Sequence, residues 1–334
     1  MHSILFNSII NSKSNFMKKR NKFVRFGLVF TVLISLLLSS CSSDDTSRET
    51  FPLSADIFHS IDGKQVAFQG LTHSAISWNW DFGDGTNSSE QNPVHVYTDG
   101  GYYVAILTAT DKSGNTEVSE VKMAIALTPY ILLTGGPTAT SGKTWKLSAS
   151  HSGNGDYFAN SDAGLTAIDG VPAPLPDGVF GLMLGMGEVY DDTFTFHFDG
   201  KYGHDVKADN ASFGGIVYQF VTTGGAGIVN PNGQEFGLCT GLYAPESDAT
   251  FTYVENEDLT TQSVYGGGGI ITYEGVSTLD FSGTEFIGFL DFQKKVIVQK
   301  VTVSSMTLVM FMAASPDFIG YNTHALVLSF EVVE

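Results

Sequence analysis

The sequence predicts an all-β protein in which an export signal is followed by two β-sandwiches. Short runs that alternate apolar and polar residues recur after residue 52, and clusters of glycine, asparagine and aspartate separate them. No run in this part has the length and period of a convincing helix. With 334 residues, 43% of them hydrophobic, the chain can bury a core. This length favours about two domains.

Residues 1–40 have the pattern of a signal peptide. A basic region, Lys18–Arg25, precedes an apolar run over residues 26–38 and two small serines. The apolar run is shorter than the roughly twenty residues that a membrane-spanning helix needs. Because a signal starts close to its basic region, we expect Met17 to be the initiator and residues 1–16 to be an upstream extension.

The run Leu38-Ser39-Ser40-Cys41 resembles a bacterial lipobox. This resemblance implies cleavage before Cys41, acylation of its sulfur and of the new amino group, and attachment to a membrane through the lipid anchor only. An ordinary signal, cleaved elsewhere or not at all, is the alternative. If Cys41 is acylated, Cys239 has no partner for a disulfide, and we expect it to be a small buried hydrophobic residue.

The chain is strongly acidic. Its formal net charge is −18, and the six basic residues before Cys41, where no acidic residue occurs, leave −24 on the mature part. A body with this charge repels phosphate backbones and anionic lipid surfaces, so nucleic acid is not an expected partner. Neutral ligands and cations remain open.

Residues 41–51 are polar and acidic, and we expect them to form a tether that holds the folded part away from the membrane. The dipeptide Asp44-Asp45 resembles a signal by which some Gram-negative bacteria send lipoproteins to the outer face of the outer membrane. The resemblance implies a lipid-anchored, cell-surface location in the outer membrane. A merely solvated linker is the alternative.

Residues 52–128 have the pattern of a small sandwich of short strands. The most specific part of the pattern lies in Trp78–Thr86, Asn92–Tyr97 and Gly101–Ala105. These stretches resemble the PKD domain, an immunoglobulin-like β-sandwich. The resemblance implies that Trp80 and Phe82 face the core and that Gly83-Asp84-Gly85 forms a hairpin turn with unusual backbone angles.

Two features of this segment suggest a binding or catalytic site, and each has a structural alternative. Asp81 and Asp84 are a conceivable metal-binding or catalytic dyad, but an aspartate at a strand-to-turn junction more often bonds its own backbone. Trp78 and Trp80 share one face of a strand because their spacing is two residues. At least one of them should therefore belong to the core rather than to an exposed sugar-stacking pair.

Residues 129–142 are expected to form a linker. They contain the start of Gly136–Thr144, which looks like a phosphate-binding loop, but five residues separate Gly136 from Gly142 where the motif has four. The residues that follow have a strand-like pattern, so no helix N-terminus is expected there to hold a phosphate. Nucleotide binding is therefore rejected.

Residues 143–334 are predicted to form a larger, jelly-roll-like β-sandwich of about nine or ten strands. Phe194, Phe196 and Phe198 alternate with polar residues, which puts His197 on the polar face of a strand. The later strands are more continuously apolar, which indicates a sheet covered on both faces. Further strands are expected over residues 216–221, 250–254, 270–273, 277–281, 286–292, 296–303, 306–312 and 325–332.

Residues 150–190 interrupt this pattern with a long tract rich in glycine, proline and aspartate. Such a tract is often functional, and we expect a loop system over one edge or face of the sandwich. Together with Lys143-Thr144-Trp145, Tyr190–Tyr202 and Phe286–Phe289, it resembles the C-terminal domains of PKD-bearing lipoproteins from glycan-foraging bacteria. The resemblance implies a surface glycan-binding protein that captures polysaccharide near a partner transporter.

Polysaccharide or oligosaccharide is therefore the expected ligand. Sugar binding needs aromatic rings for the C–H faces and a few amides or carboxylates for the hydroxyls. Candidate residues of these types lie in or beside glycine-rich loops: Asn154, Asp156, Tyr157, Phe158, Tyr190, Tyr243 and Tyr265. Tyr157-Phe158 is the first candidate, and the alternative for each ring is that it packs a loop onto the core.

No enzyme is predicted, although a jelly-roll glycoside hydrolase or lyase is one alternative. Such a hydrolase needs two carboxylates that flank the scissile bond. Glu188, Asp191 and Asp192 come nearest, but adjacent residues of a strand point to opposite faces. No cofactor is expected apart from a structural calcium ion, for which these three residues are weak candidate ligands. A purely structural or adhesive surface protein is the other alternative.

Overall fold

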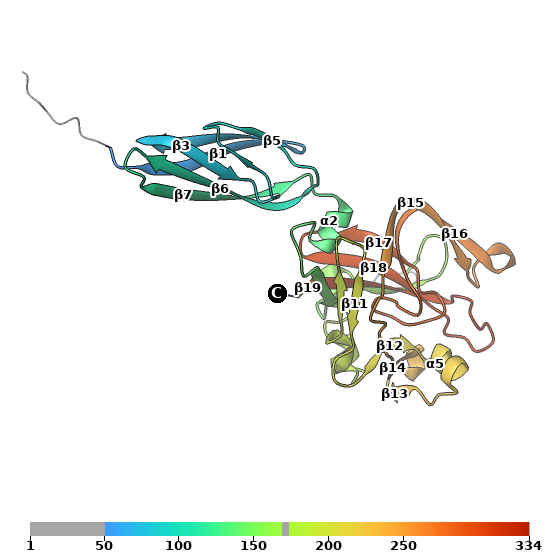
Figure 1. Cartoon of the computed structure of the whole chain (residues 1–334). Helices are drawn as coiled ribbons and strands as arrows, with labels where there is room; N and C mark the ends of the chain where they lie inside the picture. Colours follow the sequence, from blue (N-terminus) through green and yellow to red (C-terminus); the bar gives the residue numbers. More distant parts are fainter. Residues whose placement is uncertain (1–50, 169–173, 334) are drawn as a thin grey trace, which may run out of the picture. The chain divides into compact units, whose positions relative to one another are not determined.

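The computed structural model describes residues 51–168 and 174–333 (Figure 1). Cys41, the predicted signal peptide and nearly all of the predicted tether lie outside the described residues. Within the described residues, no helix has the length and hydropathy that crossing a membrane requires. The strands form two groups of sheets with separate hydrophobic cores, called here the smaller sandwich (residues 54–125) and the larger sandwich (residues 129–332).

The smaller sandwich consists of two antiparallel sheets with strand orders β1-β2-β5 and β4-β3-β6-β7. Their bounds are β1 (Ser54–Asp62), β2 (Gln65–His73), β3 (Ala75–Asp81), β4 (Asn87–Ser88), β5 (Val94–Val96), β6 (Gly101–Asp111) and β7 (Thr116–Ile125). Trp80 and Phe82 lie in the core, with 0% and 2% of their surface exposed, which confirms the prediction. Trp78 is partly buried and packs against the same core.

The turn after β3 also has the predicted form. Gly83 and Gly85 have φ values of 77° and 85°, in the left-handed region that favours glycine. The Gly83 amide donates to Oδ1 of Asp81 at 2.9 Å, and the Thr86 amide donates to Oδ1 of Asp84 at 3.0 Å. Both aspartates therefore bond the local backbone, as the structural alternative predicted.

The larger sandwich is built on a nine-stranded antiparallel sheet with the order β11-β10-β8-β19-β18-β17-β16-β15, in which β9 also pairs with β19. Its edges meet at one end, where Lys201 bridges to Thr250 and the Tyr202 amide donates to the Ala249 carbonyl at 2.9 Å. The sheet therefore curls into a half-barrel. The bounds are β8 (Lys143–Leu147), β9 (Tyr157–Asn160), β10 (Thr193–Phe196), β11 (Tyr202–Asp205), β15 (Phe251–Gln262), β16 (Ile270–Phe281), β17 (Val296–Val301), β18 (Ser305–Met312) and β19 (His324–Val332).

The central strands of this sheet are covered on both faces, as predicted from their continuous apolar sequence. On the inner face, Leu308 and Met310 of β18 belong to the main core. On the outer face, Val309 and Phe311 pack in a second cluster with Tyr273 from β16. The long β15–β16 hairpin therefore supplies the outer cover, and register shifts between β15 and β16 interrupt its regular pairing.

A small layer completes the larger sandwich at the bottom of Figure 1. It contains a three-stranded sheet of order β12-β14-β13 and helix α5. The bounds are β12 (Ala211–Gly215), α5 (Ile216–Thr223), β13 (Ile228–Asn230) and β14 (Leu238–Leu242). Phe213 from β12 enters the main core, and the Gly215 amide donates to the Leu290 carbonyl at 2.9 Å, which fixes this layer to the rest of the body.

The predicted strand over residues 216–221 is wrong, because this segment forms helix α5. Its β-branched residues favour a strand locally, but tertiary packing overrides that preference. Ile216 and Val217 are buried on one side, whereas Phe220 is exposed to water on the other. Gly224 ends the helix in a left-handed conformation with φ 65°, and its amide donates back to the carbonyls of Gln219 and Phe220.

The predicted strand over residues 286–292 is also wrong, because these residues form an irregular segment with one isolated bridge at Leu290. The segment is nevertheless buried, and Phe286, Ile287 and Phe289 are at most 1% exposed. Burial by a loop gives the same apolar run as burial in a strand, so periodicity alone could not separate the two. Of the other predictions, 270–273 and 277–281 are parts of one strand, β16.

Substitution of Gly288 by alanine should lower the free energy of unfolding by about 2 kcal/mol. Gly288 has a φ of 69°, and an added Cβ would lie 2.5 Å from Cζ of Phe330 and 2.7 Å from Sδ of Met310. Urea denaturation of the variant and of Gly267→Ala, where a Cβ meets nothing within 4 Å, measures the difference. Equal stability of the two variants would show that the core accommodates the methyl group.

The tract over residues 150–190, expected to be a loop system, also contains regular structure. Its described residues include strand β9, which pairs with β19, and three short helical turns. The helical elements of the described chain besides α5 are α2 (Pro129–Thr134), α3 (His151–Asn154), α4 (Val179–Leu182), η2 (Gly187–Tyr190), η3 (Gln234–Phe236) and η4 (Gly267–Gly269). Helix α2 lies in the predicted linker, and its Leu133 is part of the main core.

Two smaller predictions are confirmed. Lys143, Thr144 and Trp145 begin strand β8, as the strand-like pattern predicts, and Nζ of Lys143 donates to the backbone carbonyls of Leu132 and Val303 at 2.5 and 2.8 Å. Cys239 is fully buried, and burial raises the pKa of its thiol to about 12. A thiol in this environment is an inert part of the packing.

Candidate functional site

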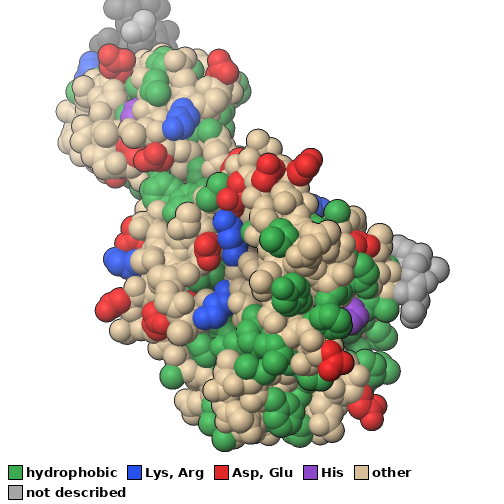
Figure 2. Space-filling model, turned by 90° about the vertical axis from the view of Figure 1, so that its right-hand side faces the viewer, with side chains coloured by type: hydrophobic (Ala, Val, Ile, Leu, Met, Phe, Trp, Pro, Cys, Tyr) green, Lys and Arg blue, Asp and Glu red, His purple; other side chains and the backbone are tan. Residues whose placement is uncertain are grey.

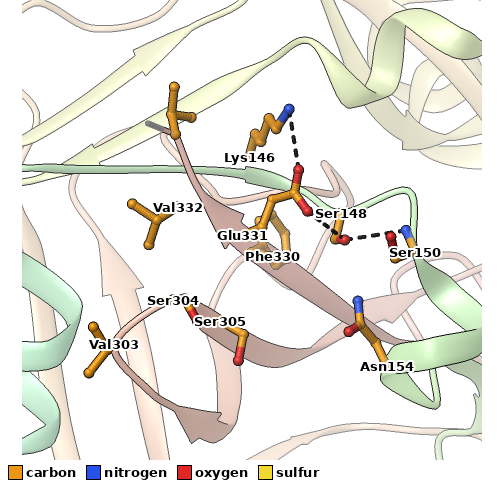
Figure 3. Close-up of a pocket in the computed structure, with 11 residues that line it drawn as sticks. Lys146, Ser148, Ser150, Asn154, Val303, Ser304, Ser305, Phe330, Glu331 and Val332 are labelled. Carbon is orange, nitrogen blue, oxygen red and sulfur yellow. Dashed lines mark hydrogen bonds and ion pairs between the residues drawn. The ribbon is translucent and has the colours of Figure 1, made fainter.

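The larger sandwich has a broad polar groove of ≈ 800 Å³. Figure 3 shows it over the ends of β8 and β19 and the turn between β17 and β18. Glu331 accepts a hydrogen bond from Oγ of Ser148 at 2.9 Å and pairs with Nζ of Lys146 at 3.3 Å. Asn154 is the predicted site residue that lines this groove. The ring in its lining, Phe330, is fully buried and offers no platform for a sugar.

A second concavity, called here the apolar pocket, has a volume of ≈ 300 Å³, at the lower end for small-ligand sites. It lies where five elements meet: β9, the start of α5, η3, the end of β18 and the start of β19. The residues that line it are Phe158, Ile168, Ile216, Gln234, Glu235, Phe236, Gly237, Met312, Ala314 and His324.

Backbone pairing fixes the walls of the apolar pocket. Met312 and His324 are cross-strand partners in the β18–β19 ladder. The Ile216 amide donates to the Gly237 carbonyl at 2.9 Å, which joins α5 to the turn that carries Phe236. Gly237 has a φ of 81°, and an added Cβ would lie 3.0 Å from that of Ala314, so glycine permits the close approach.

The chemistry of the apolar pocket suits a ligand with both apolar and hydroxyl-bearing faces. Phe236 is 56% exposed and offers a ring to solvent, whereas Phe158 is partly buried and packs on the main core. Gln234 and Glu235 stand exposed beside it. Burial lowers the pKa of His324, which favours the neutral imidazole at pH 7. Its Nδ1 lies 2.9 Å from Oγ1 of Thr323, which leaves Nε2 to offer a donor or an acceptor to a ligand.

Asp156 and Tyr190 take part in a buried hydrogen-bond network instead of lining a surface pocket. Oδ2 of Asp156 lies 2.7 Å from Nδ1 of His151, and Nε2 of His151 lies 2.9 Å from the Tyr190 hydroxyl. Oγ of Ser329 donates to Oδ1 of Asp156 at 2.6 Å. The Asp156 and His151 side chains are fully buried, so this network attaches the 150–190 tract to strand β19.

The remaining predicted tyrosines are separate from the apolar pocket. The Tyr157 hydroxyl donates to the Leu165 carbonyl at 3.3 Å, and its ring packs on the outer cluster of the sheet. The Tyr243 ring packs against Phe286, with centroids 4.9 Å apart. Tyr265 is 49% exposed, and its hydroxyl donates to Oδ1 of Asn160 at 2.8 Å. Of the predicted residues, the structure places only Phe158 in the apolar pocket.

The three candidate calcium ligands have separate surroundings. Oε1 of Glu188 accepts hydrogen bonds from Asn230 at 2.9 Å and from Thr240 at 3.3 Å. Asp192 is buried and accepts a hydrogen bond from Oγ of Ser212 at 2.7 Å, whereas Asp191 is exposed. Among the described residues, no three His, Cys, Asp or Glu side chains are grouped as a metal site requires.

Four polar or aromatic residues of the apolar pocket are not predicted from the sequence: Gln234, Glu235, Phe236 and His324. A signal for the first three is present, because Gly233-Gln234-Glu235-Phe236-Gly237 is an aromatic residue with two polar neighbours between glycines. His324 carries no such signal, since it begins an ordinary apolar strand.

Comparison with known proteins identifies part of the chain. Residues 59–125 match the family model for the PKD domain. The collagenase ColA of Bacillus cereus strain ATCC 14579 is 43% identical over 54 residues, or 16% of this chain and 6% of that protein. Collagenase ColQ1 of Bacillus cereus strain Q1 is 44% identical over 50 residues, or 15% of this chain and 5% of that protein. The chain thus covers only a small part of either collagenase.

Solved structures of other proteins also align with this chain. The PKD1 domain of the Vibrio cholerae metalloprotease PrtV is 27% identical and is covered completely by 23% of this chain, with a TM-score of 0.22. The structure of a carbohydrate-binding module from the β-sandwich superfamily aligns over 86% of this chain and 94% of its own, at 11% identity and a TM-score of 0.23, which says nothing about a ligand. The family model identifies residues 59–125 as a PKD domain.

Proposed function

We propose that this protein binds polysaccharide without cleaving it, through the apolar pocket of the larger sandwich. The observation that carries the proposal is the exposed Phe236 ring at the edge of a concave site that also holds Gln234 and the neutral His324. A pyranose presents C–H groups on its faces and hydroxyls around its rim, so it needs a ring to stack on and neutral donors and acceptors beside it.

The non-catalytic part of the proposal is supported by the carboxylates at the pocket. Glu235 is the single carboxylate among the described residues that line it. Glycoside hydrolysis by the usual mechanism needs a second carboxylate across the scissile bond, about 5–10 Å away. A pocket with one carboxylate suits recognition better than hydrolysis.

The proposal places this site on the cell surface. The lipobox-like run ending at Cys41 and the acidic residues behind it support an acyl anchor in the outer membrane, with the PKD domain as a spacer. A protein held in this way would deliver captured glycan to partner transporter proteins of an uptake system. Labelling with a palmitate analogue, and its loss in Cys41→Ala, tests the anchor independently of binding.

The binding site is tested with Phe236→Ala in the chain from residue 42 to residue 334. Affinity electrophoresis and calorimetry against a panel of polysaccharides should show binding by the native protein and about tenfold or greater weakening in the variant, as for a central aromatic contact. Phe220→Ala is the matched control, because Phe220 is 57% exposed on α5 and is not among the residues that line the pocket.

Two results would contradict the proposal. Equal affinity of Phe236→Ala and the native protein would remove the pocket as the binding site. Release of reducing ends from a bound polysaccharide would show hydrolysis and would remove the non-catalytic function.

A further inference from the structure

The larger sandwich is poor in groups that recognise anions. Arg48 is the last arginine of the chain, so none occurs in either sandwich. Arginine is the residue whose planar fork best fits carboxylate, sulfate and phosphate groups. The cations of the larger sandwich are seven lysines: Lys143, Lys146, Lys201, Lys207, Lys294, Lys295 and Lys300.

Most of these lysines are already engaged. Four form ion pairs with an acidic side chain at 2.6–3.3 Å, namely Lys146, Lys201, Lys207 and Lys295. Lys143 donates to two backbone carbonyls. Burial lowers the pKa of Lys294, and the negative charges of Glu246 and Glu285 partly oppose this shift. Among the described residues of the larger sandwich, Lys300 is thus the lysine without such an interaction, and it does not line the apolar pocket.

The apolar pocket itself carries negative charge. Glu235 lines it, and its described lining includes neither lysine nor arginine. The sequence has no basic residue from position 208 to position 293, the stretch that supplies α5 and η3. Figure 2 shows hydrophobic side chains gathered at the lower end of the larger sandwich, with lysines visible only above them.

An anionic sugar in this pocket would meet a carboxylate without a compensating cation. Two like charges about 4 Å apart repel each other by about 1 kcal/mol in bulk water and by about 4 kcal/mol at a partly desolvated protein surface. An uncharged sugar meets no such penalty and can still bond to the carboxylate through its hydroxyls. Uncharged glycans should therefore bind at this site more tightly than anionic glycans.

We infer that the apolar pocket selects uncharged polysaccharides and that Glu235 excludes those with carboxylate or sulfate groups. This inference rests on the proposed function and names the class of glycan that the same site accepts. It predicts that selectivity is a local property of the pocket and that salt weakens it, since exposed charges are screened within about 10 Å at 0.1 M ionic strength.

The test compares each of three neutral polysaccharides, a β-glucan, a galactomannan and a xylan, with a carboxylated derivative of the same backbone. Calorimetry with the chain from residue 42 to residue 334 should show at least about tenfold weaker binding of the carboxylated form at low salt. Glu235→Gln should reduce this ratio to about twofold. Glu255→Gln removes an equal charge from an exposed position on β15 and should leave the ratio unchanged.

The outcomes separate this inference from the proposed function. Equal binding of neutral and carboxylated forms by the native protein overturns the inference and leaves polysaccharide binding intact. Equal reduction of the ratio in Glu235→Gln and Glu255→Gln overturns the role of Glu235, because the net charge of the body then suffices. Failure of the native protein to bind any neutral or carboxylated polysaccharide overturns both the inference and the proposed function.

Discussion

Asp156→Ala is expected to lower the free energy of unfolding of the larger sandwich by about 4 kcal/mol. The substitution removes the acceptor for Nδ1 of His151 and for Oγ of Ser329, and both donors then stay buried without it. The loss should be large because neither the Asp156 nor the His151 side chain reaches water in the folded protein. In this variant, strand β9 and the turn that carries Tyr190 should also become less protected from hydrogen exchange.

The matched variant is Asp156→Asn, which keeps the size of the side chain. Its carbonyl can accept from His151 and its amide can donate to the Ser329 hydroxyl, so the loss should be about 1–2 kcal/mol. Hydrogen exchange of peptides from residues 143–334 reports the larger sandwich separately from the PKD domain. Equal protection in Asp156→Ala and Asp248→Ala, which changes an exposed turn residue, would show that the buried network contributes little.

The fold is predictable from the sequence where local pattern and tertiary burial agree. Alternation correctly predicts the buried face of Phe194 and Phe196, and the motif around Trp80 correctly predicts the core of the PKD domain. The prediction fails at residues 216–221 and 286–292. In both segments apolar residues are buried by packing against distant parts of the chain, and period and propensity do not report the backbone conformation that results.

The candidate site is less predictable, for a related reason. Aromatic and carboxylate residues in glycine-rich loops serve equally as ligand contacts and as internal anchors, so Phe158 and Asp156 look alike in the sequence. The anchor role of Asp156 depends on Ser329, which lies 173 positions away along the chain. His324 likewise enters the apolar pocket only because β18 and β19 pair with Met312 opposite it.

The larger sandwich should become more stable as the pH falls from 8 to 5. Burial raises the pKa of Asp192 and of Asp291 to about 7. The hydrogen bond from Ser212 opposes this effect at Asp192, as does Lys207, whereas Asp209 and Asp205 add to it. An unfolded aspartate has a pKa of about 3.9. The folded protein therefore binds more protons than the unfolded chain between about pH 4 and pH 7.

Linkage gives the sign and size of the effect. The stability from each protonated carboxyl is fully present below about pH 4 and is lost as the pH rises through about 7. The two groups together should make the free energy of unfolding at pH 5 exceed that at pH 8 by about 5 kcal/mol. His324 acts in the opposite direction, because its lowered pKa favours protonation of the unfolded chain below about pH 6.5.

Asp192→Asn isolates one of the two carboxyls. The amide keeps a hydrogen bond with the Ser212 hydroxyl, which accepts or donates equally well, so the fold should survive. Urea denaturation at pH 5 and pH 8 should show about half of the native pH dependence in this variant. Asp248→Asn, at an exposed turn, should keep all of it. If the free energy of unfolding of Asp192→Asn depends on pH as strongly as that of the native protein, water or a cation stabilises the buried carboxylate at neutral pH, since burial alone opposes the charged form.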